Sequence, residues 1–412
     1  MSPEAAPPRR DADLDDGLSR KHTASVLKVM NLIYRKAPIT RRALEGISGF
    51  SHPTVIRDVV RLVQAGLVSE SPLRDPGRRG KTAANLQVKR DGKYLIAVEV
   101  RSNLLIGVLM DFAGTVFHRA SAVCRSRKRD DTVARIVETV QSLRLRARRR
   151  GRILGLCVAF PGTIGSDPKM VRSFHGRGGW EDYPLAHVLE ARFGIETLLV
   201  HNSNAHIRAE YHFASGASER NMLGVYLDNG MGMGILVDGS VYEGTTFAAG
   251  EIGHLPYGDA DEPCHCGRRG CLERFGSEVY LLEKMNARLG TRYSTIRDLL
   301  AKAALSTDDR SFVSALLEQA LLVLSRGIAT AVTLFNPGRV VVHGGIVPLA
   351  PENIDRLRAY VTTHAFPASA GVTIALSTLD DTAAALGAGA TFVERFYDVR
   401  RGYISSVLKI RP

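Results

Sequence analysis

The sequence lacks an uninterrupted run of about 18 apolar residues, the length at which a hydrophobic segment becomes a candidate membrane span. It also lacks a secretory signal, because residues 1–16 are polar and proline-rich and contain no apolar stretch. Such a composition does not support a packed core, so a disordered tail is expected over 1–16. The two absences predict a cytoplasmic protein with no membrane partner.

Cysteine is scarce, since the 412 residues include 5, which is an odd number. Cys124 and Cys157 stand alone in apolar surroundings, whereas the other three lie within the eight residues from Cys264 to Cys271. A disulfide framework would need a more even distribution and an oxidising compartment. Clustered cysteines with a nearby histidine indicate a metal site instead.

Acidic residues are rare in one part of the chain. Residues 17–90 contain 15 Lys and Arg against 4 Asp and Glu, whereas residues 91–412 contain 38 against 33. The formal net charge of +13 therefore arises mainly from a short N-terminal segment. Clustered positive charge attracts polyanions through counterion release. This asymmetry predicts a nucleic-acid-binding domain over 17–90 and a separate domain over 91–412.

Three helices are predicted within the N-terminal segment. Apolar residues recur at helical spacing from His22 to Ala37, and Thr40 can cap a short second helix that ends at Gly49. Ser51 can cap a third helix that continues to residue 68. Five aliphatic residues of this helix are expected to face the core: Val55, Ile56, Val59, Val60 and Val63. Four polar residues are expected to point away from it: His52, Thr54, Arg57 and Arg61.

A β-hairpin is predicted after the third helix, from Leu67 to a second strand at 84–88. Its tip, RDPGRRGK, combines turn residues with three cations: Arg78, Arg79 and Lys81. Helix, short helix, turn, helix and basic hairpin is the order of a winged helix-turn-helix DNA-binding domain. We expect Thr54 and Arg57 at base edges and the other cations at phosphates. A small helical domain with a solvated charged face is the alternative.

Strands and helices alternate from residue 91 onwards, which predicts an α/β fold. The expected elements are a hairpin over 94–117, a helix over 131–152, a strand over 153–164, a helix over 184–193, a strand over 197–202, a glycine-rich hairpin over 222–242, a helix over 313–335, a strand over 339–345 and a helix over 382–395. Their arrangement cannot be deduced from this alternation alone.

The strongest local pattern is the series His254-x9-Cys264-x-Cys266-x4-Cys271. Three thiolates and one imidazole supply the four ligands of a tetrahedral Zn²⁺ ion. Gly267 and Gly270 allow the loop before the last cysteine to fold back on itself. Because four protein ligands leave no position for water, the zinc is expected to be structural. Free cysteines in a loop are the alternative.

The zinc pattern lies within a longer string, AAGEIGH followed by CHCGRRGCLE, which resembles the ROK family of repressors, open reading frames and sugar kinases. Further segments resemble the same family: AFPGTIG at 159–165, NPGRVVVHGG at 336–345 and DDTAAALGAGA at 380–390. The predicted helix-turn-helix and the GRRGK of the hairpin resemble its repressor branch. The resemblance covers essentially the whole chain. It implies a two-lobed actin-like or ribonuclease H-like ATPase architecture, with a sugar bound between the lobes.

The resemblance also implies a set of sugar-binding residues. In family kinases the sugar hydroxyls are held at positions that correspond here to Glu251, His254 and Glu273. Carboxylates accept hydrogen bonds from hydroxyl groups, and a metal that fixes one histidine nitrogen leaves the other free for a sugar. The alternative is that these three residues only brace the metal loop.

Three departures from the family kinases predict that the chain is not an enzyme and has no catalytic residue. The glycine-containing phosphate loop is replaced by residues 98–103, which contain no glycine. Asn202 stands where the kinases have the aspartate that acts as general base, and an amide cannot take up the proton. Asp228 replaces a glycine near the phosphates and would repel them. Asn202 can still form hydrogen bonds, so we include it among the sugar ligands.

The resemblance therefore implies a transcriptional regulator, more specifically a repressor, of carbohydrate uptake or catabolism genes. The expected partners are double-stranded operator DNA and a sugar or sugar-phosphate effector. We expect the effector to change the spacing of two DNA-binding domains within a homodimer or homotetramer. Two alternatives stay open: control by a protein partner such as a phosphotransferase component, and residual sugar kinase activity.

Overall fold

The computed structural model describes residues 20–72, 84–89, 93–124, 126, 128–147, 151–174, 177–214, 219–228, 230–257 and 261–396. The tail expected over 1–16 and the predicted hairpin tip with Arg78, Arg79 and Lys81 lie outside the described residues. The chain divides into two compact units: Met1–Asp91 together with Val393–Pro412, and Gly92–Phe392.

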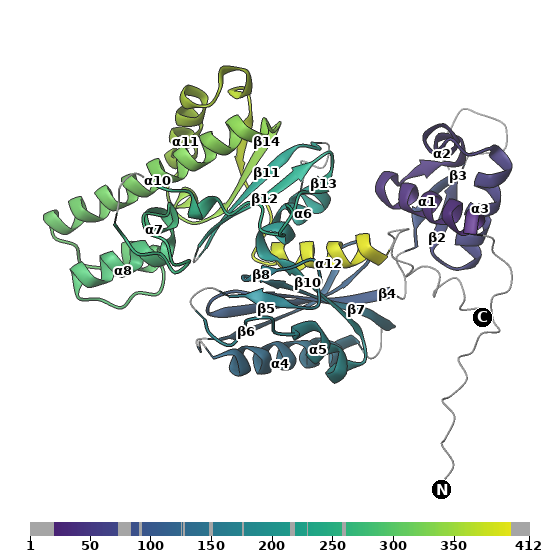
Figure 1. Cartoon of the computed structure of the whole chain (residues 1–412), viewed down its shortest axis with the longest axis horizontal. Coiled ribbons are helices and arrows are strands. Elements are labelled where there is room, and N and C mark those ends of the chain that lie inside the picture. Colours follow the sequence, from purple (N-terminus) through teal and green to yellow (C-terminus); the bar gives the residue numbers. More distant parts are fainter. Residues whose placement is uncertain are drawn as a thin grey trace, which may run out of the picture. The chain divides into compact units, whose positions relative to one another are not determined.

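Within the described residues, the first unit contains three helices and a three-stranded antiparallel sheet with the strand order β1-β3-β2 (Figure 1). Its elements are α1 (Arg20–Lys36), β1 (Ile39–Thr40), α2 (Arg41–Ser48), α3 (His52–Gln64), β2 (Val68–Pro72) and β3 (Ala84–Val88). The backbone N–H of Ala43 donates to Oγ1 of Thr40 at 3.2 Å, and Gly49 ends α2 with a φ of 71°. These two residues set the limits of α2 as the sequence predicts.

The third helix is shorter than predicted and turns a different face inward. It ends at Gln64, because a turn with Gly66 at a φ of 66° follows. Val55, Val59 and Leu62 are fully buried, whereas Ile56 is 38% exposed and Val60 39% exposed. The prediction that Ile56 and Val60 face the core is therefore wrong. Each follows a buried valine by one residue, which rotates it about 100° around the helix axis.

The second unit begins with a lobe built on five strands, which we call the first lobe (residues 93–201). Its strand order is β10-β7-β4-β5-β6, with β4, β5 and β6 antiparallel and β7 and β10 parallel to β4. The strands are β4 (Lys93–Val100), β5 (Leu104–Asp111), β6 (Val116–Val123), β7 (Arg152–Phe160) and β10 (Glu196–His201). The hairpin predicted over 94–117 is thus wrong in extent. The turn at 112–115 is followed by a third antiparallel strand, β6, so β4, β5 and β6 form a β-meander.

Helices cover both faces of this sheet, as Figure 1 shows. Helices α4 (Arg129–Ala147) and α5 (Leu185–Phe193) lie on one face, and α12 (Ala383–Phe396) lies on the other. Burial on both faces explains why β4 and β5 read as nearly continuous apolar runs in the sequence. A short pair, β8 (Thr163–Ile164) and β9 (Val171–Ser173), completes the lobe.

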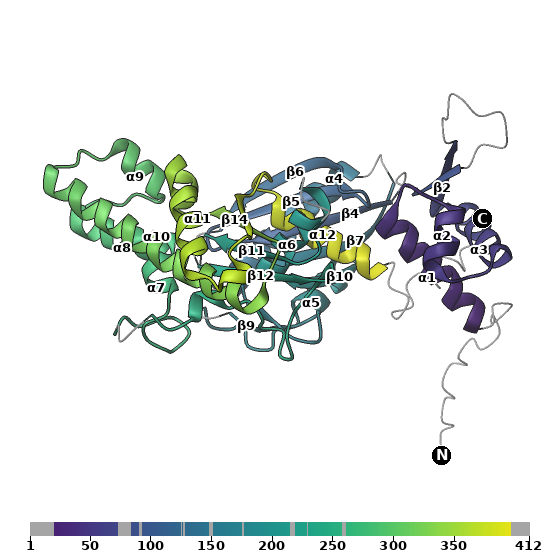
Figure 2. The ribbon, with the colours of Figure 1, turned by 90° about the horizontal axis from the view of Figure 1, so that it is seen from above.

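The second lobe (residues 202–376) contains another five-stranded sheet, with the order β13-β12-β11-β14-β15. Its strands are β11 (Met222–Leu227), β12 (Met231–Val237), β13 (Ser240–Val241), β14 (Arg339–Gly344) and β15 (Thr373–Leu376). Its helices are α6 (Asn202–Phe213), η1 (Ile252–His254), α7 (Glu273–Gly276), α8 (Glu278–Leu289), α9 (Ile296–Lys302), α10 (Thr307–Phe335), η2 (Val347–Leu349), α11 (Pro351–His364) and η3 (Pro367–Ser369). Figure 2 shows α8, α9 and α10 gathered at the end of this lobe away from the first sheet. The α/β prediction is confirmed.

Helix α10 begins six residues before the predicted start and contains a long apolar stretch. An 18-residue window within it has a mean hydropathy of 1.5, so by length and composition this one helix among the described residues could cross a membrane. Half of that window is buried inside the unit, and its buried residues belong to the core shared with the second sheet and α11. A core helix of a soluble protein meets the same criteria.

Two helices connect the lobes where they meet. Helix α6 follows β10 directly and packs on β11 and β12, while α12 packs on the first sheet. A Cβ at Gly387 in α12 would lie 1.7 Å from the carbonyl oxygen of Ala205 in α6, so this close crossing requires glycine. The start of α6 is thereby held at the junction of the two sheets.

Candidate functional site

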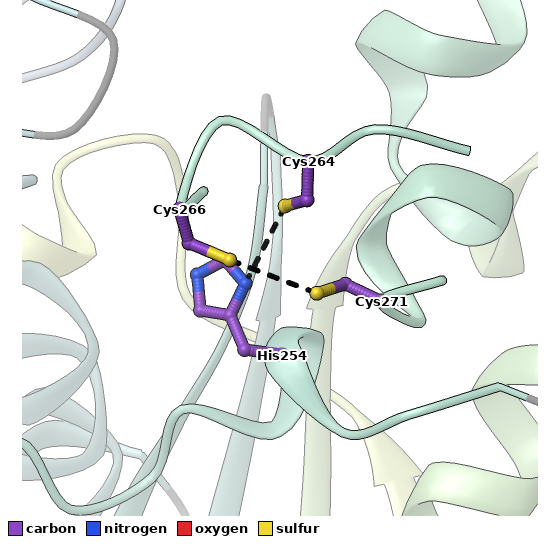
Figure 3. Close-up of side chains that lie close together, drawn as sticks. All are labelled: His254, Cys264, Cys266 and Cys271. Atoms are coloured by element: carbon purple, nitrogen blue, oxygen red, sulfur yellow. Dashed lines mark hydrogen bonds between the residues drawn. The ribbon is translucent and has the colours of Figure 1, made fainter. Parts of the chain in front are cut away.

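Four potential metal ligands converge beside the second sheet. His254 comes from η1, and Cys264, Cys266 and Cys271 come from the loop before α7 (Figure 3). Their ligand atoms all lie within 4.8 Å of one another. Nδ1 of His254 is 3.7 Å from Sγ of Cys264, and Sγ of Cys266 is 3.7 Å from Sγ of Cys271. Ligands about 2.3 Å from a tetrahedral metal would be separated by roughly 3.7 Å. The donor set therefore fits a tetrahedral metal.

The loop is folded by its own backbone. The N–H of Cys264 donates to the carbonyl of Arg268 at 2.8 Å, and the N–H of Gly270 donates to that of Glu262 at 2.9 Å. Gly267 has a φ of 88°, a left-handed conformation that favours glycine over other residues. The cysteines are thus brought together by local sequence.

Burial, together with the neighbouring thiols of Cys266 and Cys264, raises the pKa of the Cys271 thiol to about 12. A thiolate at this position consequently needs a cation beside it, which a bound metal would supply. Metal binding by this loop would release protons, so it should weaken as the pH falls.

Three of the predicted sugar ligands lie next to the metal loop. Nε2 of His254 is 3.8 Å from a carboxylate oxygen of Glu251, while its Nδ1 lies towards Cys264. One ring can therefore bind a metal through Nδ1 and present Nε2 beside a carboxylate. Burial and the negative charge of Glu273 raise the pKa of Glu251. The structure brings Glu251, His254 and Glu273 together, as expected from the resemblance.

Glu273 has two partners in this site. Its carboxylate accepts a hydrogen bond from the backbone N–H of Met231 at 3.0 Å and lies 3.1 Å from Nδ1 of His265. Burial acts to raise the pKa of Glu273, but His265, the backbone N–H of Met231 and His254 together outweigh it, and the pKa is lowered. Sequence reasoning missed His265, although its position between two of the candidate metal-ligand cysteines placed it beside the site. An ionised Glu273 is a strong acceptor for hydroxyl groups.

Asn202, the fourth predicted sugar ligand, begins α6 at the junction of the lobes. It is buried, and its Nδ2 donates to the carbonyl of Val100 at the end of β4 at 3.1 Å. Its Oδ1 has no hydrogen-bond partner among the described residues. A Cβ at Gly232 would lie 2.1 Å from Oγ of Ser203, so the start of α6 packs directly against β12. Asn202 therefore contacts the first lobe and lies near the strand that supports Glu273.

A buried polar network connects the lobes close to Asn202, and sequence reasoning missed it. Glu99 on β4 is fully buried and accepts from Nη2 of Arg101 at 2.9 Å and from the hydroxyl of Tyr226 on β11 at 3.3 Å. The Tyr226 hydroxyl also lies 3.2 Å from Oδ2 of Asp228. His206 on α6 stacks on Tyr226 and has Nε2 3.7 Å from Glu99. We call Glu99, Arg101, His206, Tyr226 and Asp228 the interlobe network.

The interlobe network keeps the buried carboxylate of Glu99 in its ionised form. Burial acts to raise the pKa of Glu99, but His206 and Arg101 lower it to about 2. Burial and the neighbouring carboxylates raise the pKa of Tyr226 well above its usual range, so its hydroxyl keeps its proton. Arg101 also donates to the backbone carbonyl of Asp381 at 2.8 Å, just before α12. The network lies at the C-terminal ends of β4 and β11.

The predicted DNA-contacting residues of α3 differ in their surroundings. His52 is exposed and pairs with Glu45, and the hydroxyls of Thr54 and Ser51 are 3.0 Å apart. Arg57 is half-buried, with Nε donating to Asp58 at 3.0 Å and Nη2 donating to Ser25 at 3.3 Å.

Arg61 lies one turn after Arg57 on the same helix. It is also half-buried, and its Nη1 has no hydrogen-bond partner among the described residues.

The profile of one protein family matches residues 96–395, and its description is the ROK family. The chain belongs to the ROK family. The xylose repressor of Bacillus spizizenii is 24% identical over 369 residues, which cover 89% of this chain and 94% of the repressor. A solved ROK transcriptional regulator, a homologue of the E. coli MLC protein, has a TM-score of 0.75 at 21% identity and covers 94% of this chain and 99% of its own.

A kinase of the ROK family shares the fold of the second unit. The ROK glucokinase of Streptomyces griseus, solved with glucose and AMPPNP, has a TM-score of 0.62 at 19% identity. It covers 72% of this chain and 98% of its own. The two lobes described here therefore form the actin-like, sugar-kinase-like fold of the ROK family.

Proposed function

We propose that this chain is a sugar-controlled, DNA-binding transcriptional repressor. The observation that carries the proposal is the extent of the similarities. The xylose repressor aligns with 89% of the chain, whereas the glucokinase covers 72% and the ROK match begins only at residue 96. The part of the chain that the alignment with the repressor includes and the match with the glucokinase lacks corresponds to the first unit. We also propose a cytoplasmic location and a homodimer or homotetramer, whose symmetry would match a palindromic operator.

We assign the first unit as a winged helix-turn-helix domain for duplex DNA. Helices α2 and α3 are joined by a turn at Gly49, and β2 and β3 form the base of the hairpin. The excess of Lys and Arg over 17–90 suits a polyanion. The assigned contacts are His52, Thr54, Arg57 and Arg61 on α3, with Arg78, Arg79 and Lys81 at the hairpin tip.

Selection of random-sequence duplex DNA by the full-length, zinc-loaded protein tests this assignment. We expect a palindromic sequence to be enriched and its affinity to fall steeply as salt rises. Arg57→Ala should cost about 1–3 kcal/mol on the selected duplex and relax one base position. Arg61→Ala should weaken binding equally on all duplexes, because it is assigned to phosphate. Lys302→Ala, which removes an exposed cation of the second unit, serves as the control. Failure to bind any duplex at low salt would contradict the proposal.

We assign the metal as structural Zn²⁺ held by His254, Cys264, Cys266 and Cys271. Zinc supplies no chemistry for a reaction here, because the four protein ligands complete its shell. It fixes Nδ1 of His254 so that Nε2 lies beside Glu251. Glu251 and Glu273 then accept hydrogen bonds from vicinal hydroxyls of a sugar. Asn202 completes the sugar site from the junction of the lobes, so that a bound sugar favours one lobe arrangement.

We infer that the sugar is bound but not phosphorylated. Asn202 cannot act as a general base. Glu99 and Asp228 are carboxylates at the C-terminal ends of β4 and β11, and Arg101 is paired with Glu99 at 2.9 Å. Phosphate groups approaching these strands would meet the negative charge of Asp228.

Calorimetric titration with hexoses, pentoses and amino sugars tests the sensor function. We expect one sugar class to bind, and Glu251→Gln to weaken it about 10- to 100-fold, because a charge-assisted hydrogen bond is lost. Consumption of ATP should stay at background in the presence of that sugar, also in Asn202→Asp, in which the carboxylate is restored. Binding of none of the sugars would contradict sensing, and ATP-dependent phosphorylation would contradict the loss of catalysis.

A further inference from the structure

The exposed face of α3 carries two aliphatic side chains. Ile56 and Val60 are four residues apart, so they lie on the same side of the helix. They are 38% and 39% exposed, whereas Val55, Val59 and Leu62, which lie further round the helix, are fully buried. Since Val55, Val59 and Leu62 already face the core, Ile56 and Val60 are accessible to a partner outside the unit.

Three polar side chains beside this face have partners within the first unit. Arg57 donates to Asp58 and Ser25, and His52 pairs with Glu45. Thr54 lies at hydrogen-bond distance from Ser51. The exposed surface of α3 therefore combines these polar groups and Arg61 with the methyl and methylene groups of Ile56 and Val60.

The charge of the unit indicates what covers this face. Residues 17–90 contain 15 Lys and Arg against 4 Asp and Glu, so the complementary partner is a polyanion rather than a neutral apolar surface. Duplex DNA is a polyanion whose wide major groove also presents an apolar group, the 5-methyl of thymine. Duplex RNA has uracil in place of thymine and a major groove too narrow for a helix.

We propose that Ile56 and Val60 contact thymine methyl groups in the major groove, so that part of the operator sequence is read by apolar contact. The inference rests on the proposed DNA-binding function and adds the chemistry by which A·T pairs are selected. It assigns specificity to two residues that the sequence pattern placed in the core. Each buried methyl should contribute about fourfold in affinity, the equivalent of about one buried CH₂ group.

Uracil substitution in the DNA tests the proposal directly. The full-length protein first selects its duplex from a random-sequence library, and each thymine of that duplex is then replaced in turn by uracil. This change removes the methyl group and keeps the Watson–Crick pairing. We expect about fourfold weaker binding at one or two positions for the wild-type protein. Ile56→Ala and Val60→Ala should each bind the thymine and uracil versions of one such position equally well.

Ile47→Ala is the matched control, because Ile47 is 52% exposed on the neighbouring helix α2. It should keep the dependence on the thymine methyl groups. If every uracil-containing duplex binds the wild-type protein as tightly as its thymine counterpart, the inference is wrong. The same holds if Ile56→Ala and Val60→Ala keep the methyl dependence or instead change the oligomeric state. Absence of any selected duplex is a separate result, which contradicts the DNA-binding function itself.

Discussion

Replacement of Cys271 by serine is expected to remove the metal and to lower the free energy of unfolding of the second unit by more than about 4 kcal/mol. Cys271 is 1% exposed, and its sulfur lies 3.7 Å from that of Cys266. A hydroxyl at this position is a poor zinc ligand, and three remaining ligands cannot close the shell. Metal analysis of the purified protein, together with thermal unfolding, measures both effects.

The loss of metal should also remove sugar binding. A metal on Nδ1 would hold Nε2 of His254 beside Glu251, and the metal loop leads directly into Glu273. Cys124→Ser is the control, because Cys124 is a buried cysteine of the first lobe, far along the chain from the loop. We expect about one zinc per chain in the wild type and in Cys124→Ser, and none in Cys271→Ser. Full metal content and unchanged stability in Cys271→Ser would show that the loop holds no structural zinc.

Neutralising Glu99 is expected to have the second largest effect, a loss of about 3–5 kcal/mol at pH 7. Glu99→Gln removes the charge that faces Arg101 at 2.9 Å and leaves the half-buried guanidinium without its counter-ion. The weakened contact between Tyr226 and residue 99 also loosens the junction of the lobes. Urea unfolding of the variant and the wild type measures the difference.

The effect of Glu99 should depend on pH in a defined direction. The pKa of Glu99 is lowered from 4.5 to about 2 in the folded protein. Because the folded value lies below the unfolded one, ionised Glu99 stabilises the fold above about pH 4.5, and this contribution disappears as the pH falls towards 2. The shift corresponds to about 3 kcal/mol. The difference in stability between wild type and Glu99→Gln should therefore shrink between pH 5 and pH 3.

An exposed pair provides the comparison for Glu99. Glu138 lies 2.7 Å from Arg135 on α4, and both side chains are more than half exposed. Glu138→Gln should change stability by less than about 1 kcal/mol, because exposed ion pairs contribute little. If Glu99→Gln behaves like Glu138→Gln, or if its effect is the same at pH 7 and pH 3, the interlobe network does not stabilise the fold as argued.

Local features of the fold were predictable from the sequence. Thr40 and Gly49 define the ends of α2, whereas Ser51 precedes α3 without the expected capping hydrogen bond. The spacing of His254 and the three cysteines also indicated a cluster that the structure brings together as a candidate metal site. These features depend on hydrogen bonds and turns within a few residues, so short-range patterns are sufficient to predict them. Strand β6 was not predicted as a separate strand, because the turn before it lies within a stretch of sequence that looks like one continuous strand.

Contacts between distant residues were not predictable. Glu99 in the apolar run of β4 could have signalled a buried carboxylate, but nothing indicated that Tyr226 and His206 would be its partners. His265 was overlooked as a partner of Glu273, although it lies within the metal loop. The exposure of Ile56 and Val60 depended on which side of α3 the rest of the first unit covers.

The amino-acid order alone indicated the basic N-terminal segment, the cap of α2 at Thr40, the candidate metal ligands and the presence of Asn202 at the start of α6. Each of these depends on residue type or on neighbours close in the chain. The tertiary structure alone decided that residues 127 positions apart, Glu99 and Tyr226, share a hydrogen bond, and which aliphatic face of α3 is left outside. The hydrogen bond between Glu99 and Tyr226 forms when the two sheets pack around α6 and α12. That packing depends on the whole second unit rather than on any one segment of the sequence.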